Sequence, residues 1–79
     1  MLKDHYLIED YPEMVDQIEN LFNASMKSVE MAEKADFNTK HEILADMNRS
    51  LEILQALNRR KINQDVDNGA RELIRRNYF

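Results

Sequence analysis

The stretches MVDQIENLFNASMKSVEMA (residues 14–32) and ILADMNRSLEILQAL (residues 43–57) decide the fold of this chain. In both, apolar residues recur every three or four positions, which is the spacing of one face of an α-helix. Two amphipathic helices are therefore predicted, each with an apolar stripe that needs a neighbour. The stripe residues are Met14, Val15, Ile18, Leu21, Phe22, Val29 and Ala32 in the first stretch, and Ile43, Leu44, Met47, Leu51, Leu54 and Leu57 in the second.

The segment between the two stripes carries a helix-start signal. Residues 39–42 (TKHE) have the spacing of a capping box, in which the Thr oxygen and the Glu carboxylate each accept a hydrogen bond from an unpaired backbone N–H group. Pro12 suits the first turn of a helix, because its missing N–H would have no partner there. We therefore predict a first helix over about residues 12–35 and a second that follows Thr39 and ends near Arg60. The two would pair as an antiparallel helical hairpin.

The C-terminal segment keeps helical spacing but allows two interpretations. Asn63 or Asp65 could cap a new helix, which favours a third helix over about residues 64–77. The alternative is one long helix, because no proline interrupts residues 40–79. We expect the separate third helix, which gives an all-α fold: an antiparallel helical hairpin with a third C-terminal helix, or small helical bundle. Its apolar residues are Ile62, Val66, Ala70, Leu73 and Ile74.

Length and composition limit the possibilities further. The 79 residues allow one helical domain, expected over residues 11–79, and Tyr6 with its apolar neighbours favours packing of residues 1–10 on that bundle. The absence of cysteine excludes disulfides and thiolate chemistry. No signal peptide or long apolar run is visible, so we expect a cytoplasmic protein.

Motifs for chemistry are incomplete. His41 and Glu42 begin like a zinc-protease helix, but Ala45 stands where the second histidine is needed. Asp65 and Asp67 resemble the start of a calcium loop, whose other ligand positions are not filled. Neither a nucleophile–base pair nor a glycine-rich phosphate loop is present. We therefore predict no enzyme activity, no metal site and no cofactor.

Charge is distributed unevenly along the chain. Residues 1–58 contain 5 Lys/Arg and 12 Asp/Glu, whereas residues 59–79 contain 6 and 3. The acidic body disfavours nucleic-acid binding, which depends on contacts with phosphates. A basic C-terminal segment that docks on nucleic acid or an acidic partner is a competing hypothesis. The cations it would use are Arg71, Arg75 and Arg76.

Protein binding is the function that the composition favours most. Five methionines are many for a chain of this length, and methionine-lined surfaces adapt to varied apolar ligands. A two-helix hairpin offers too little interior for all the apolar residues, so we expect an exposed groove or a homodimer interface. The partner protein itself is not indicated. The candidate apolar contacts are Leu57, which belongs to the second stripe, and five residues off the main stripes: Met26, Met31, Ile53, Tyr78 and Phe79.

Two stretches resemble the flagellin export chaperone family. LFNASMKSVEMAEKADFNTKHEILADMNRSLEILQALN (residues 21–58) is similar to the central helical hairpin of that family, and VDNGARELI (residues 66–74) to the helix that follows. The chain is shorter and lacks the Leu-Tyr pair expected in the third helix. The resemblance implies a cytoplasmic chaperone that holds the amphipathic end of an export substrate in an apolar groove, and no site residues are carried over. A small phage-type inhibitor that blocks a host complex is the alternative.

Overall fold

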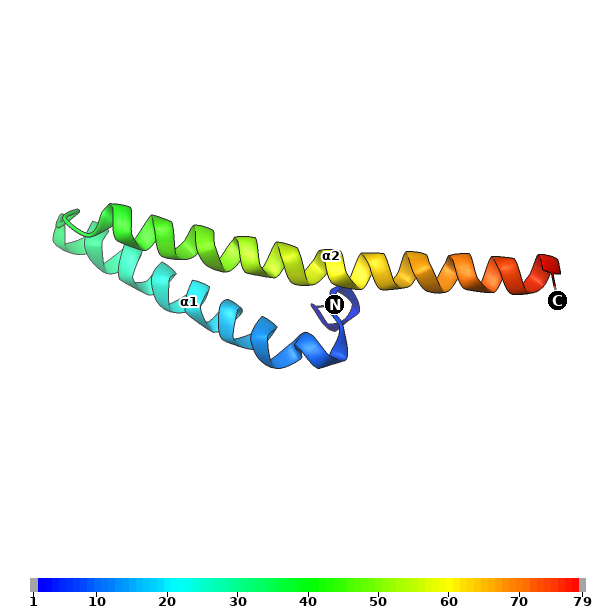
Figure 1. The fold of residues 1–79 in the computed structure, drawn as a ribbon. Helices are drawn as coiled ribbons and strands as arrows, with labels where there is room; N and C mark the ends of the chain where they lie inside the picture. The colour runs from blue at the N-terminus through cyan, green and yellow to red at the C-terminus, as the bar shows by residue number, and fades with distance from the viewer. Residues whose placement is uncertain (1, 79) are drawn as a thin grey trace.

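The protein consists of two α-helices of unequal length. The computed structural model describes the backbone of residues 2–78 and the side chains of residue 2 and residues 4–69. Helix α1 spans Tyr11–Lys34 and helix α2 spans Lys40–Tyr78. Two short 3₁₀ turns, η1 (Leu2–His5) and η2 (Ile8–Asp10), come before α1. The predicted all-α class is confirmed, with no strand over residues 2–78. The molecule is a rod of 66 × 17 × 16 Å, in which α1 packs along the first part of α2 (Figure 1).

Helix α1 ends in a left-handed residue. Ala35 has φ 52° and ψ 37°, its N–H donates to Ala32 O, and the N–H of Asp36 donates to Met31 O at 3.0 Å. These two bonds form a Schellman cap, a motif in which glycine normally occupies the left-handed position because it has no Cβ. Alanine there carries a conformational penalty of about 1–2 kcal/mol.

The cap gives a test of this turn. Ala35→Gly is expected to raise the free energy of unfolding by about 1 kcal/mol, because glycine adopts positive φ without the Cβ clash. Ala32→Gly, at an exposed position inside α1, is the matched control and is expected to lower it by a similar amount. Urea denaturation followed by circular dichroism measures both. A loss of stability in both variants would contradict the left-handed conformation at residue 35.

The start of α2 differs from the predicted capping box. Thr39 is the turn residue before the helix, and its carbonyl accepts from Ile43 N at 3.1 Å. Its hydroxyl lies 3.5 Å from Met31 Sδ, toward which it donates. The side chain of Thr39 therefore ties the start of α2 to the end of α1, because the chain reversal brings Met31 within reach.

The predicted third helix is wrong: α2 continues without a break through residues 61–63. Lys61 Nζ lies 3.0 Å from Asp65 Oδ1, so the aspartate expected to cap a new helix instead pairs with the preceding turn. Gly69 has no atom within 4 Å of the place a Cβ would occupy, and it is accommodated in the helix. At a rise of 1.5 Å per residue, α2 is about 58 Å long and α1 about 36 Å, so the end of α2 projects beyond α1 (Figure 1).

The core between the helices is small. Met14, Leu54 and Leu57 form its buried cluster. Nearer the loop, Ser50 is 1% exposed and accepts a hydrogen bond of 2.7 Å from Asn20 Nδ2 of α1, so a small polar side chain occupies the contact there. The half-buried residues around the cluster are Tyr6, Tyr11, Ile18, Leu21 and Ile53.

The N-terminal segment lies against α2 at the open end of the helix pair (Figure 1). Asn58 Nδ2 donates to His5 O at 2.9 Å. Arg60 Nε lies 3.4 Å from the buried Asp10 carboxylate, and Arg60 Nη2 lies 3.4 Å from Glu9 Oε1. With Tyr6 packed on the core, these contacts place residues 2–10 between the start of α1 and the middle of α2.

Candidate protein-binding surface

Each helix carries a row of exposed apolar side chains separate from its buried face. We call Val15, Phe22, Met26 and Val29 the α1 row, and Leu44, Leu51, Ile62 and Val66 the α2 row. Their side chains are between 51% and 65% exposed. These eight residues make up most of the exposed large hydrophobic residues in the described part of the chain, whose other members are Leu2, Ile8 and Phe37.

The two rows lie on the same side of the helix pair. With 3.6 residues per turn, each row lies roughly 120–140° round its helix from the residues that face the other helix, in the same rotational sense. Since the chain reverses between Lys34 and Lys40, the helices run in opposite directions (Figure 1). Equal rotations on antiparallel helices lead to the same side. The rows therefore border one common apolar face.

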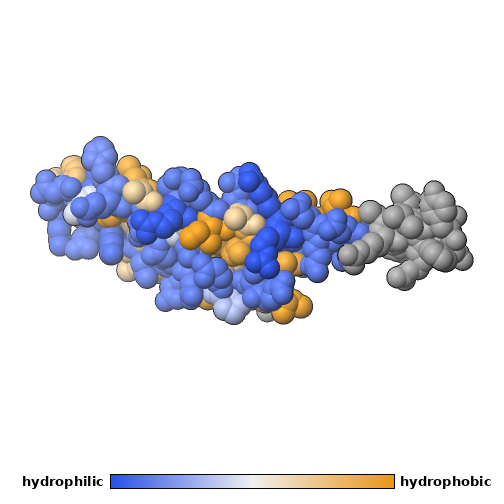
Figure 2. All heavy atoms as spheres, in the orientation of Figure 1, coloured by the Kyte–Doolittle hydropathy of each residue, from blue (hydrophilic) through white to orange (hydrophobic). Residues whose placement is uncertain are grey.

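The N-terminal segment lines hollows beside both rows, so residues of the same chain occupy part of the space between the rows. Leu2 lines a shallow, almost entirely apolar hollow together with Val15 and Phe22. Tyr6, four residues later, lines another hollow together with Leu51. Figure 2 shows apolar side chains gathered near the middle of one view of the molecule, with hydrophilic side chains around them.

The apolar residues singled out from sequence lie in different environments. Met26 belongs to the α1 row, and Met31 is half-buried where its sulfur meets Thr39. Leu57 is 8% exposed and Ile53 is half-buried against the same core, so the structure places neither of these two candidates on an exposed surface. Both point toward α1 and the N-terminal segment, because the helical register that buries Leu54 also turns them inward.

The C-terminal candidates lie outside the described side chains. Arg71, Arg75, Arg76 and Tyr78 belong to α2 by their backbone, and Phe79 lies beyond the described residues. Arg60, which sequence reasoning assigned to the end of a helix, instead pairs with Asp10. The sequence contains no signal for this pairing, because Glu9 and Asp10 come close to Arg60 only in the folded chain.

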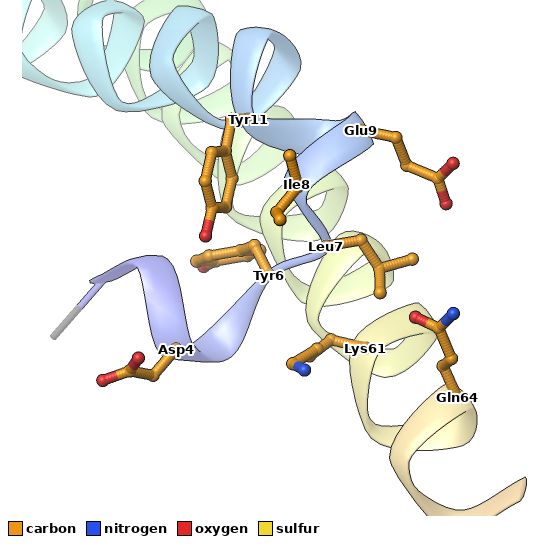
Figure 3. Close-up of a pocket in the computed structure, with 8 residues that line it drawn as sticks. All are labelled: Asp4, Tyr6, Leu7, Ile8, Glu9, Tyr11, Lys61 and Gln64. Carbon is orange, nitrogen blue, oxygen red and sulfur yellow. The ribbon is translucent and has the colours of Figure 1, made fainter. Parts of the chain in front are cut away.

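A third hollow lies between the N-terminal segment and α2 (Figure 3). The carboxylates of Asp4 and Glu9 point away from each other and from its centre in Figure 3. These two carboxylates therefore do not converge on a common point in this hollow. The residues that line it are Asp4, Tyr6, Leu7, Ile8, Glu9, Tyr11, Lys61 and Gln64.

The ion pair between Lys34 and Glu30 is typical of a solvated helix surface. Lys34 Nζ lies 2.6 Å from Glu30 Oε1, and this hydrogen bond, aided by the lysine charge, lowers the pKa of Glu30. Within the described range, no three His, Cys, Asp or Glu side chains are grouped to hold a metal ion. None of the helices, as far as the structure describes them, is both long and apolar enough to cross a membrane.

Comparison with known proteins gives no match to a protein family, a curated protein or a solved structure.

Proposed function

We propose that this protein is a non-enzymatic protein-binding module that docks its apolar helix face on a partner protein. The observation that carries the proposal is the pair of exposed rows on one side of α1 and α2. Exposed apolar side chains that gather along one side of a small protein, with polar residues around them, are typical of interaction sites.

An amphipathic helix is the partner element that fits this face best. An amphipathic helix presents apolar residues at positions i, i+3 or i+4 and i+7, a spacing that matches rows running along a helix. None of the eight row side chains is charged, so covering them leaves no buried charge without a partner. A chaperone-like adaptor and an inhibitor of a host complex would both use this surface and differ in the protein they bind.

Site-specific photo-crosslinking tests the proposal in living cells. A photoreactive amino acid at position 22 or 51 is expected to give a crosslinked product, because both positions lie on the face. The same amino acid at the exposed Lys27 or Arg49 is the control, since these positions lie on other sides of their helices. Equal crosslinking at row and control positions, or none at the rows, would contradict the proposed function.

A further inference from the structure

We infer that the partner on this face is a second copy of the chain, and that two copies pack face to face as a four-helix bundle. The inference rests on the proposed function, because it names the occupant of the same surface. In a symmetric pair each chain would supply one two-helix layer, and each α1 row and α2 row would be covered by rows of the other chain. Such an interface is self-complementary, as a two-fold axis requires.

The spacing of the rows fits packing between helical layers. Val15, Phe22 and Val29 follow one another at intervals of seven residues, and Leu44 and Leu51 do the same. A seven-residue interval keeps side chains in a straight seam along a slightly supercoiled helix, as in four-helix bundles. The α2 row also includes Ile62 and Val66, which do not follow the seven-residue interval and lie on the part of α2 that extends past the start of α1.

The exposed area also fits a missing partner. The chain exposes 6565 Å², whereas a compact monomer of 9.4 kDa exposes about 5,000 Å² by the usual scaling of surface with mass. The difference is about 1,500 Å² per chain, and it includes the surface of the end of α2 that projects beyond α1 as well as the apolar rows. A stable dimer needs about 800 Å² from each partner, so two such elongated chains expose enough surface in total to form one.

The size of the core supports the same conclusion. In the described part of the chain only Met14, Ala24, Leu54 and Leu57 are buried apolar residues. A chain of this length without disulfides commonly gains its remaining stability from association. A second copy of the chain is always present at the same concentration as the first. In a two-fold dimer the rows of one copy face the same rows of the other.

Sedimentation equilibrium of the full chain tests the inference. We expect wild-type protein to approach twice 9.4 kDa at high micromolar concentration. Phe22→Asp is expected to weaken the dimer about 30-fold or more, because it places a charge at the centre of the apolar seam. Asn23→Asp adds the same charge to the neighbouring exposed position and is expected to change the dissociation constant less than about threefold.

A second pair of variants guards against misfolding. Leu51→Lys is expected to dissociate the dimer, whereas Glu52→Lys, next to it and exposed, is expected to leave it intact. Retained helical circular dichroism shows that the variants fold. A wild-type monomer at high concentration, or dimers of Phe22→Asp and Leu51→Lys as strong as the wild type, would overturn the inference. In that case, crosslinking of the rows to a different protein would leave the proposed function standing.

Discussion

Leu57→Ala is expected to lower the free energy of unfolding by about 2–5 kcal/mol. Leu57 is 8% exposed and packs with Met14 and Leu54 in the buried cluster. Truncation removes most of the buried apolar surface of the Leu57 side chain. It also leaves a cavity, which the two packed helices can close only in part. Since a domain of this size has a total stability of roughly 4–12 kcal/mol, the variant should be partly unfolded at moderate temperature.

Ile8→Ala provides the control for this prediction. Ile8 is 80% exposed, so its truncation should change stability by less than about 0.5 kcal/mol. Chemical denaturation at one fixed protein concentration measures both variants, because association would make stability depend on concentration. Equal effects of Leu57→Ala and Ile8→Ala would show that the cluster around Leu57 is not the core.

Ser50→Leu is expected to lower the free energy of unfolding by about 2–4 kcal/mol. Ser50 is 1% exposed at the contact with α1, so added side-chain volume must force the helices apart. The substitution also removes the hydroxyl that accepts the hydrogen bond from Asn20. Thermal or urea unfolding followed by circular dichroism measures the loss.

Ser50→Ala separates volume from hydrogen bonding. It removes the same hydroxyl but adds no bulk, so it should cost only about 0.5–1.5 kcal/mol. A Ser50→Leu variant as stable as Ser50→Ala would mean that the helices do not approach each other closely at this position.

The two helices could be predicted from apolar spacing, but the length of the second could not. Asn63 and Asp65 are good capping residues, which favoured a break in the sequence interpretation. In the structure Asp65 pairs with Lys61, and nothing between residues 60 and 64 forces the chain to turn. A capping residue marks the start of a helix only if the residues before it are not helical. The identity of the capping residue does not show whether that condition is met.

The candidate surface was hidden because two faces on each helix were read as one. Val15 directly follows Met14, and Phe22 directly follows Leu21. All four residues were therefore interpreted as one broad apolar stripe that faces the core. In the structure Met14 is buried while Val15 is 51% exposed. The seven-residue interval from Val15 to Val29 was the available signal that a second seam exists beside the first.

The role of Arg60 depended on contacts that no local pattern contains. Asp10 and Arg60 are fifty residues apart, and their ion pair forms only when the N-terminal segment lies across the helix pair. The same segment brings Leu2 to the α1 row and Tyr6 to the α2 row. Long-range placement of this kind follows from the tertiary fold, so sequence alone could not give it.

The central claim is that the apolar rows of α1 and α2 are covered by a second copy of this chain. Isotope-filtered nuclear Overhauser spectroscopy on an equal mixture of labelled and unlabelled wild-type protein tests it most directly. We predict intermolecular contacts from the Phe22 ring to apolar protons of the other chain, with the methyl groups of Leu44 and Leu51 as its nearest candidates. A spectrum in which Phe22 shows contacts only within its own chain, at concentrations where sedimentation would detect association, would contradict the claim.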